Sequence, residues 1–598
     1  MDRTAARPHR TRALAALLAF GLIAGLAAGA RSGAPQAVAA GASPPNILVV
    51  MTDDETYDDA RYMPNFQRLA RRGASFTNAF VSFPICCPAR ATFLTGQYAH
   101  NHGVKSNFKV TGGGFESLQN QGETLPVWLQ RAGYSTGFVG KYLNEYGGSD
   151  PHLIPPGWDD WHGLVDYSTY NYFNWAINDN GQLRYYGDRD YADALIGLAH
   201  AGVSGDLDTP AEGLAKALEL FQPFEYFGTE DQADYQIDVV GRIADRSLGE
   251  LASGEQPFFL WYTPTAPHRE GDFEGIGGAR TGHPKPDPRP PQRYEHEFDD
   301  VPLPRDPSFN EADVSDKPET VSERPRLDRE TIDTLTENHH GRLGALLAAD
   351  DAVGRMLRTL RRSGELDNTL VIYTTDQGFF QGQHRIAFDK YIPYEEAIRI
   401  PLAIAGPGVP RGEVVRDPVY NHDLAPTILD AAGAEPGRTE DGISLLPRLR
   451  GAELPPRALL LEALAPALPF EIGNPVFDHQ VPFYGVRTEH WKYIKWSFGA
   501  EELYDLREDP YELENLAGDP GQDAVKTRLA DLSQRLRGCS GSDCLGLGHE
   551  GPPGAENAVA PVAGHQEPSN AAGILILAAF AIAAVAGIAT LARRLRRV

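Results

Sequence analysis

The stretch NILVVMTDD, residues 46–54, decides the fold. It is a short apolar run that stops at two adjacent carboxylates, Asp53 and Asp54. A strand buried on both faces of a parallel sheet has this pattern, and polar residues begin where the strand ends. The same order recurs far downstream, where TLVIYTT, residues 369–375, stops at Asp376. The two runs are therefore predicted to be strands of one mainly parallel sheet.

Helices and further strands are predicted between these two runs. Helical patterns cover residues 118–132 and 333–362, and short strands are expected at 135–139 and 257–262. Strands that alternate with helices predict an α/β fold with a large, mainly parallel sheet flanked by helices. Because open sheets of this class bind ligands at the carboxyl ends of their strands, the carboxylates that follow the two runs are expected to meet there.

A large domain is predicted over residues 44–435 and a smaller one over 436–538. Within the first, residues 270–330 are dense in Pro, Asp and Arg and are interpreted as a long loop that walls a cleft. The second shows two strand patterns and a closing helical pattern, at 490–494, 502–506 and 525–536. It is predicted to be a C-terminal α+β subdomain containing an antiparallel sheet.

Both ends of the chain carry apolar runs next to basic residues. Arginines within the first twelve residues precede an apolar run over 13–30, which predicts a signal peptide or an N-terminal anchor within residues 1–42. Residues 571–592 carry no charge, are long enough to cross a bilayer, and lead into a basic cytoplasmic tail at 593–598. These patterns predict an exported protein, held at the extracytoplasmic face of the cell membrane by a single-pass C-terminal helix.

Net charge and cysteine content limit which partners and which cysteine roles are expected. The formal charge of −26 argues against nucleic acid as a partner, because binding a phosphate backbone needs a basic face. The chain has four cysteines, of which Cys539 and Cys544 are predicted to close a small disulfide loop at the start of a stalk over 539–570. Adjacent cysteines seldom bridge each other, so Cys86 and Cys87 need another explanation.

The most specific segment is CCPARATFLTG, residues 86–96. It matches CxPxR followed by LTG, and on these residues the chain resembles the type I, formylglycine-dependent sulfatases. The resemblance implies an alkaline-phosphatase-like fold and a maturation enzyme that oxidises Cys86 to formylglycine (3-oxoalanine). Counting from Cys87 would misplace Pro88 and Arg90, so Cys87 is interpreted as a buried structural thiol. Pro88 suits a first helical turn, which predicts the nucleophile at a helix N-terminus, and Arg90 is expected to hold a diol oxygen.

The resemblance also implies a calcium site. Asp53 and Asp54 resemble the paired aspartates that bind Ca²⁺ in sulfatases, and Asp376 with Gln377 stands in the place of a later Asp-Asn pair. Carboxylate, amide and diol oxygens, the last from the modified Cys86, are the ligands that this hard cation takes. Gln377 departs from the family pattern, since it keeps the amide carbonyl but lengthens the arm. Taken alone, each acidic pair is also explained as the start of a loop.

Cationic and polar residues complete the site that the resemblance implies. Lys141, in GKYLNEY, is the expected contact to the sulfate or the leaving group, and Lys390, in FDK, is expected to hold sulfate oxygens. His268, in TAPH, is expected to bind substrate and to protonate the leaving oxygen. Many members have histidine at the position of Leu143, whereas GKYLN resembles the N-acetylglucosamine-6-sulfatase branch, in which Asn144 would take over part of that role. The alternatives are that His268 caps a turn and that Lys390 is a solvated surface lysine.

Three further histidines lie near these motifs: His100, His102 and His384. They are interpreted as packing or supporting residues rather than catalytic ones. The segment at 502–517 resembles the closing segment of the family, so the resemblance extends from residue 46 to about 536.

The resemblance implies hydrolysis of sulfate monoesters, including glycan sulfates such as 6-sulfated N-acetylglucosamine. Three alternatives stay open: an arylsulfatase acting on small aromatic sulfates, a phosphate or phosphonate ester hydrolase of the same superfamily, and a surface binding protein on a retired sulfatase scaffold. A Thr or Ser nucleophile with two transition metals would favour the phosphatase reading, and Cys86 in CxPxR does not.

Overall fold

The computed structural model describes residues 44–190, 192–193, 196–197, 200, 231–270, 287–388, 390–454, 456–464 and 481–548. Of the unit that comprises Met1–Pro44, only Pro44 is described, and the described residues from Pro45 onward form one compact unit. The predicted signal or anchor over 1–42 lies outside the described residues. The predicted boundary between residues 435 and 436 stays a prediction.

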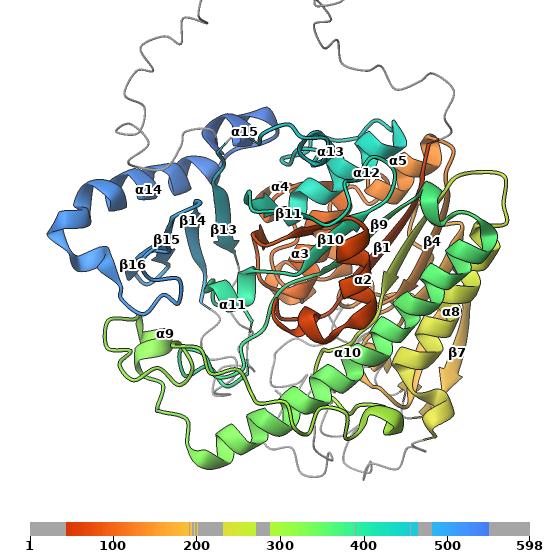
Figure 1. Ribbon diagram of the computed structural model, residues 1–598, viewed down its shortest axis with the longest axis horizontal. Coiled ribbons are helices and arrows are strands. Elements are labelled where there is room, and N and C mark those ends of the chain that lie inside the picture. Colours follow the sequence, from red (N-terminus) through yellow and green to blue (C-terminus); the bar gives the residue numbers. More distant parts are fainter. Residues whose placement is uncertain are drawn as a thin grey trace, which may run out of the picture. The chain divides into compact units, whose positions relative to one another are not determined.

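A large sheet forms the centre of this unit (Figure 1). It has ten strands in the order β11-β2-β10-β9-β1-β8-β4-β5-β6-β7. Its central strands run parallel: β9 (Thr369–Thr375), β1 (Asn46–Thr52), β8 (Phe258–Thr263), β4 (Ser135–Gly140) and β5 (Asp160–Leu164). Antiparallel pairing adds β10 (Leu402–Ala405) on one side and β6 (Trp175–Asp179) with β7 (Gln182–Tyr186) on the other. The short β2 (Ala74–Phe76) and β11 (Glu413–Val415) complete the sheet. The predicted large, mainly parallel sheet is confirmed.

The two runs that predicted the sheet are its neighbouring central strands. Every residue of β1 and β9 is buried, and the register pairs Asn46 with Thr369 and Thr52 with Thr375. The strands therefore end level with each other. Residues that follow them leave the sheet side by side, as the sequence pattern predicts.

Helices cover both faces of the sheet, because alternate residues of a buried strand point to opposite sides. Leu48 and Val50 pack in a core with α2 (Pro64–Arg72), α8 (Gln236–Leu251) and α10 (Arg329–Ser363), and α8 and α10 run along each other in Figure 1. Ile47 and Val49 point into the opposite core, which contains α3 (Cys86–Thr95), α5 (Leu125–Arg131) and α12 (Leu424–Ala432).

The C-terminal part contains a four-stranded antiparallel sheet, β13-β14-β15-β16. Its strands are β13 (Leu459–Ala463), β14 (Phe483–Arg487), β15 (Trp491–Trp496) and β16 (Glu501–Asp505), and α14 (Asp523–Leu536) packs on β14. The predicted antiparallel sheet and closing helix are therefore confirmed. The remaining short elements are β3 (Ala79–Phe80), α4 (Ala99–His102), α9 (Glu319–Ser322), α11 (Glu395–Ile398), β12 (Val419–Tyr420), α13 (Leu446–Leu449) and α15 (Ser542–Gly548).

Two sequence predictions differ from the structure in extent. The helix expected over 118–132 is confined to α5, because residues 118–124 form turns and bends and Pro126 lies in the first turn of the helix. The described part of the expected loop, residues 287–330, contains short helical turns and α9 between irregular stretches, and its last two residues begin α10.

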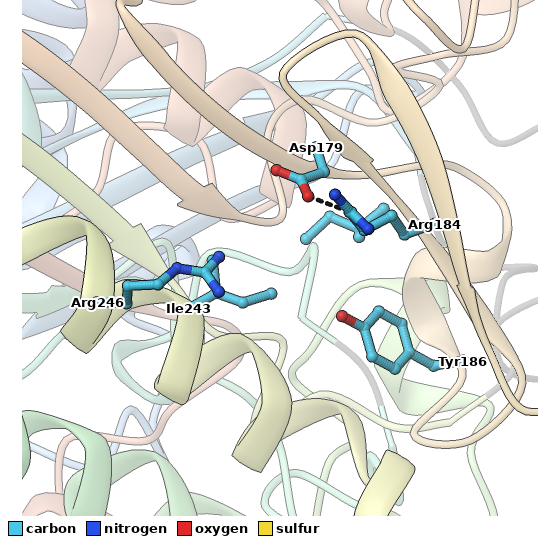
Figure 2. A pocket seen from close by; sticks show the side chains of 6 residues that line it. Asp179, Arg184, Tyr186, Ile243 and Arg246 are labelled. Carbon is cyan, nitrogen blue, oxygen red and sulfur yellow. Dashed lines mark hydrogen bonds and ion pairs between the residues drawn. The ribbon is translucent and has the colours of Figure 1, made fainter.

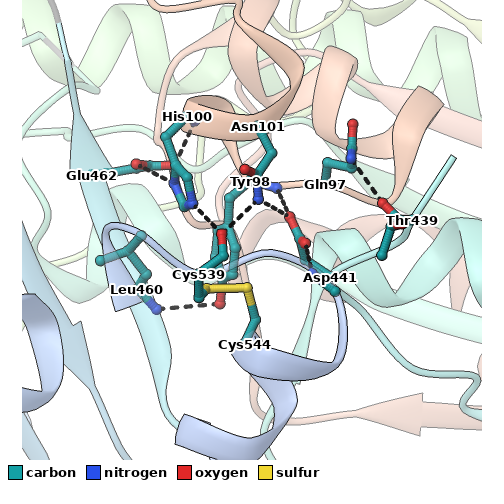
Figure 3. Close-up of a disulfide and its surroundings, with 11 residues drawn as sticks. Gln97, Tyr98, His100, Asn101, Thr439, Asp441, Leu460, Glu462, Cys539 and Cys544 are labelled. Carbon is teal, nitrogen blue, oxygen red and sulfur yellow. Dashed lines mark hydrogen bonds and ion pairs between the residues drawn. A yellow bond between two sulfur atoms is a disulfide. The ribbon is translucent and has the colours of Figure 1, made fainter. Parts of the chain in front are cut away.

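Cys539 and Cys544 form the predicted disulfide, which closes a loop at the start of α15 (Figure 3). The carbonyl of Cys539 accepts hydrogen bonds from His100 Nε2 and Asn101 Nδ2, each at 3.0 Å. Asp441 Oδ1 accepts one from the Gly541 amide at 2.6 Å. The disulfide loop is thus tied to the helical turn α4.

The predicted localisation needs correction. Within the described residues, no helix is both long enough and apolar enough to cross a bilayer. The helix predicted over 571–592, its tail and most of the predicted stalk lie outside those residues. A single-pass C-terminal anchor is therefore not supported, and the location at the membrane inferred from it is withdrawn.

Candidate active site

Cys86 begins α3, as the position of Pro88 predicts. Ile85 is the extended N-cap residue, and all ten residues of the helix are buried, with Cys86 only 1% exposed. The Cys87 amide in the first turn donates to Asn107 Oδ1 at 2.9 Å. Gly96 ends the helix at φ 67°, and a Cβ there would lie 2.9 Å from Glu440 Oε1. The CxPxR motif and LTG therefore mark the start and the end of one buried helix.

The ends of β1 and β9 bring the acidic pairs to Cys86. The Asp54 amide donates to Asp376 Oδ1 at 3.2 Å, which joins residues that lie 322 positions apart. Asp53 Oδ1 lies 3.7 Å from Cys86 Sγ, and Gln377 Nε2 lies 3.4 Å from the same sulfur. Gln377 Nε2 also donates to Asp54 Oδ1. The expected convergence of the two strand ends on Cys86 is thus present.

Arg90 lies one helical turn after Cys86 and is fully buried. Its Nε donates to Asp376 Oδ2 at 2.8 Å, and its Nη2 lies 3.4 Å from Asp53 Oδ2. Its Nη1 donates to the carbonyl of Lys141 at 2.6 Å. Burial lowers the pKa of Arg90, but the charges of Asp376 and Asp53 outweigh it, so the net shift is upward. Arg90 cross-links two of the carboxylates, and its expected contact to a diol oxygen stays a prediction.

Lys141 follows β4 directly and points to the end of β1. Its Nζ lies 2.6 Å from Asp53 Oδ2. Burial lowers the pKa of Lys141, but Asp53 and Cys86 raise it by more. Gly140, at φ 123°, lets the chain turn here, because a Cβ at this position would lie 2.0 Å from the Thr263 carbonyl oxygen of β8. The GK pair therefore combines a close strand contact with a buried cation.

Lys390 and His268 lie on the Asp54 side of the site. Lys390 Nζ donates to both carboxylate oxygens of Asp54, at 2.9 and 2.7 Å, and lies 3.1 Å from His268 Nε2. His268 Nδ1 lies 2.7 Å from the carbonyl oxygen of Arg269, which can only accept. We therefore assign the proton to Nδ1, which leaves Nε2 as the acceptor facing Lys390 and Asp54. Both residues therefore contact the site, which does not agree with a solvated surface position for Lys390 or with a purely turn-capping role for His268.

The charges in this buried cluster are arranged in opposite pairs. Burial raises the pKa of Asp53, but Lys141, His268 and Arg90 outweigh that effect and the pKa is lowered. Asp53 is therefore ionised in the neutral pH range. Carboxylates of this kind are stable in a protein interior only where cations or hydrogen bonds compensate them.

The donor atoms are suited to a metal ion. One ligand atom from each of Asp53, Asp54, Cys86 and His268 lies within 4.8 Å of the other three. Gln377 Oε1 is buried and accepts no hydrogen bond from any described residue. An amide oxygen in this state beside carboxylate oxygens fits a hard cation such as Ca²⁺, whereas the thiol and the imidazole suit softer ions.

Asn144 is connected to the site by Tyr170, a residue that the motifs did not predict. Its Nδ2 donates to the Tyr170 hydroxyl at 2.7 Å. The Tyr170 ring lies 4.8 Å from Lys141 Nζ and 4.8 Å, between ring centroids, from His268. Leu143, which replaces the histidine of many members, is packed in the core. Tyr170 comes from an aromatic segment at 167–173, and only that composition hints at its place.

Arg342 is a second residue that the sequence did not reveal. It comes from the middle of α10 and donates to the carbonyl oxygens of Asp54 and Pro267, the latter at 3.1 Å. It therefore connects the segment after β1 with the segment that carries His268. A single arginine within a long amphipathic helix gives no sequence signal of such a role.

The three remaining histidines pack elsewhere, as expected. His384 Nδ1 lies 2.7 Å from Glu311 Oε2, and its ring packs on Tyr394. His100 contacts Glu462 (Figure 3), and His102 Nε2 lies 3.1 Å from Thr92 Oγ1.

Comparison with known families agrees with this geometry. The family model described as sulfatase matches residues 45–434. The model described as N-sulphoglucosamine sulphohydrolase, C-terminal, matches residues 382–538. Together they cover the large sheet with the site and the C-terminal antiparallel sheet.

Individual relatives point the same way. The extracellular sulfatase SULF-1 homolog of Drosophila melanogaster is 34% identical over 417 residues, which cover 68% of this chain and 31% of that protein. The N-acetylglucosamine-6-sulfatase of Homo sapiens is 32% identical over 425 residues, 69% of this chain and 66% of the relative. The chain thus spans between about a third and two thirds of the length of these curated relatives.

A solved structure supports the fold. A protein in complex with its substrate D-glucosamine-2-N,6-O-disulfate superposes with a TM-score of 0.62 at 23% identity, over 83% of this chain and 98% of that chain. The matched family model spans both strand ends, the CxPxR helix and the two lysines that surround Cys86. The chain therefore belongs to the sulfatase family.

Proposed function

We propose that the protein hydrolyses sulfate monoesters, R–O–SO₃⁻ plus water giving an alcohol and sulfate. The position of Cys86 carries the proposal: it begins a buried helix inside the matched sulfatase region and lies among two aspartate-bearing strand ends and two lysines. A helix N-terminus favours an anion, and the surrounding cations favour the charge that develops on a sulfuryl group.

The nucleophile is proposed to be formylglycine made from Cys86. Conversion of –CH₂–SH plus water to –CHO plus H₂S releases two electrons and two protons, which an oxidant supplied by a maturation enzyme must accept. The hydrated aldehyde carries two hydroxyl groups. One attacks sulfur as the S–O bond to the alcohol breaks, and the second loses its proton as the carbonyl re-forms and sulfate leaves. A serine or a thiol has no second hydroxyl and lacks this exit.

The surrounding side chains are assigned by their positions. Lys141 and Lys390 would hold sulfate oxygens, because their ammonium groups contact Asp53 and Asp54 respectively, next to Cys86. His268 would deliver the proton to the leaving oxygen from Nε2 when the ring is an imidazolium with both nitrogens protonated, since Nδ1–H stays engaged by a backbone carbonyl. Arg90 would keep two carboxylates in place.

We propose Ca²⁺ as the ion for the oxygen donors of Asp53, Asp54, Asp376 and Gln377, together with an oxygen of the modified Cys86. Bound there, it would supply positive charge next to the sulfuryl group. Replacement of the Cys86 sulfur by oxygen would make the donor set uniformly hard, which supports Ca²⁺ over a softer ion.

The substrate is proposed to be a glycan sulfate such as 6-sulfated N-acetylglucosamine. Relatives named N-acetylglucosamine-6-sulfatase support this class. Asn144 supports it chemically, because its buried Oδ1 accepts no hydrogen bond from any residue in the described ranges and could accept one from a sugar hydroxyl. Residues 44–435 are proposed as the catalytic domain and 436–538 as its C-terminal subdomain.

Two measurements test the proposal on protein produced with a maturation system. Peptide mass spectrometry across Cys86 should show replacement of the thiol by an aldehyde. Sulfate release should be found with 6-sulfated N-acetylglucosamine and should be absent in Cys86→Ala, while Cys87→Ala, the matched thiol control, keeps activity if it folds. Active protein with unmodified Cys86 would refute the mechanism. If the protein hydrolyses only aryl sulfates, or only phosphonate esters, the proposal that its substrates are glycan sulfates is wrong.

A further inference from the structure

A second polar site lies on the outer hairpin of the large sheet, where β6 and β7 face α8 (Figure 2). Here a pocket of about 320 Å³ is lined by Ile177, Asp179, Arg184, Tyr186, Ile243 and Arg246. None of these residues belongs to the site around Cys86. The pocket is therefore a separate feature of the molecule.

The pocket follows from the register of the hairpin. Ile177 pairs with Arg184 across β6 and β7, and alternate residues of a strand share one face, so Asp179 and Tyr186 lie on the same side. On α8, Ile243 and Arg246 are three residues apart and share one helix face. The two isoleucines supply the aliphatic part of the lining. In Figure 2 the Arg246 guanidinium and the Tyr186 hydroxyl point toward each other from the two sides of Ile243.

Positive charge exceeds negative charge at this pocket. Arg184 pairs with Asp179. Arg246 makes no hydrogen bond or ion pair with any residue that the structure describes, and Arg242, one turn away on α8, donates only to the Ala233 carbonyl, at 3.1 Å. In a chain with a net charge of −26, an arginine cluster with a single carboxylate partner is a local excess of positive charge.

Tyr186 reports the same charge distribution. Burial raises its pKa and the charge of Asp179 adds to that effect, whereas Arg184, Arg246 and Arg242 act to lower it, and the net shift is upward. Its ring stacks on Trp175 at a centroid distance of 4.3 Å, which fixes the aromatic wall of the pocket.

We propose that this pocket is a second, non-catalytic binding site for an anionic sugar. Arg246 and Arg184 hold a sulfate or carboxylate group, since a guanidinium offers two parallel donors to such oxygens. Ile177, Ile243 and the edge of Tyr186 contact the sugar ring. The inference rests on the proposed function in one respect, namely that the ligand is a glycan with several anionic groups. A glycan bound at two places on the molecule would bind more tightly than a monosaccharide.

Binding is tested in the full chain carrying Cys86→Ala, so that turnover does not enter the measurement. The test variant adds Arg184→Gln and Arg246→Gln. The matched control adds Arg71→Gln and Arg450→Gln, which remove the same charge from exposed positions outside the pocket. Titration calorimetry uses three probes: a sulfated hexasaccharide of alternating glucosamine and uronic acid, glucosamine 6-sulfate, and sodium sulfate.

The hexasaccharide should bind the test variant at least about tenfold more weakly than the parent and the control, the loss of one or two charged hydrogen bonds. Glucosamine 6-sulfate should bind all three proteins alike if it occupies only the site around Cys86. Equal hexasaccharide affinity in the test variant and the control would overturn the inference, and so would complete competition by sulfate alone at an equal concentration of anionic groups.

A failure of the proposed function is distinguishable from a failure of this inference. The calorimetric result needs no catalysis, so it stands even if the protein releases no sulfate from any ester. Conversely, the Arg184→Gln, Arg246→Gln variant with Cys86 intact should hydrolyse glucosamine 6-sulfate at the parent rate. Thermal melting of each variant shows whether a lost affinity reflects a lost fold.

Discussion

Arg90 is a fully buried cation between two buried carboxylates, Asp53 and Asp376. Replacing it with glutamine would leave both carboxylates without their shared partner, and an uncompensated buried charge costs about 3–5 kcal/mol. We therefore expect Arg90→Gln to lower the free energy of unfolding by that amount, measured by guanidinium denaturation. Arg61→Gln, in a half-exposed pair with Asp58, should change it by about 0–1 kcal/mol. Similar losses in the two variants would show that the Arg90 pairs contribute no more than a surface pair.

Metal removal gives a second test at this scale. A ligand that binds only the folded protein stabilises it by about 2.7 kcal/mol at a hundred times its Kd. Chelation should therefore lower the melting temperature, and Ca²⁺ should restore it more effectively than Mg²⁺. Gln377→Leu removes the buried amide oxygen and should reduce this calcium-dependent rise, whereas Gln292→Leu, at an exposed position, should leave it unchanged. An identical calcium response in both variants would exclude Gln377 as a ligand.

Residues that the motifs single out lie near Cys86 in the structure, and their chemical roles stay predictions. The carboxylates at 53, 54 and 376, the lysines at 141 and 390, and His268 all surround Cys86 in the structure. Tyr170 and Arg342 could not be predicted. They reach the site from segments with no motif, and only the packing of the whole chain places them there.

The segment that follows β4 contains a buried acid whose protonation should affect stability. Burial raises the pKa of Glu145 from 4.5 to about 7, although the Lys109 amide and the Tyr167 hydroxyl, which donate to it, act in the opposite direction. The folded protein therefore binds this proton more tightly than the unfolded chain does. The contribution of Glu145 is fully present below pH 4.5 and is lost as the pH rises through about 7.

Glu145→Gln, which stays neutral, should thus have a flatter dependence of unfolding free energy on pH than the parent. The difference between the two slopes, integrated from about pH 4 to pH 8, should approach about 3 kcal/mol. Guanidinium denaturation across this pH range measures it, and Glu250→Gln on α8 serves as the control. Parallel pH profiles for the parent and Glu145→Gln would contradict the raised pKa.

At the scale of elements, buried strands and long helices can be predicted from the sequence, whereas exposed strands cannot. The strands β1 and β9 and the helix α10 were predicted nearly to their ends, because continuous burial or a long helical period leaves a clear pattern. The hairpin of β6 and β7 was not predicted. Its outer strand, QLRYY, has no buried residue and carries too little apolar patterning to identify a strand from sequence.

At the scale of the molecule, the sequence predicts two sheets but not how they are joined. The C-terminal sheet shares a hydrophobic core with one face of the large sheet. Lys492 of β15 lies 2.9 Å from Glu395 of α11 and 2.7 Å from Glu512. Such contacts depend on distant segments meeting, which no local pattern encodes. Family resemblance, rather than periodicity, supplied the overall arrangement.

The disulfide between Cys539 and Cys544 is expected to stabilise the folded protein. The backbone of the disulfide loop contacts His100 and Asn101 of α4, the turn that follows the Cys86 helix. Closing a loop this short removes conformational entropy from the unfolded chain equivalent to about 2 kcal/mol. Reduction, or the double variant Cys539→Ser and Cys544→Ser, should therefore lower the unfolding free energy by about that amount. The double variant should be insensitive to reductant, and reductant should leave the fold around Cys87 unchanged, because Cys86 and Cys87 are both free thiols in this structure. If reductant destabilises the parent and the double variant equally, the effect does not come from this bond.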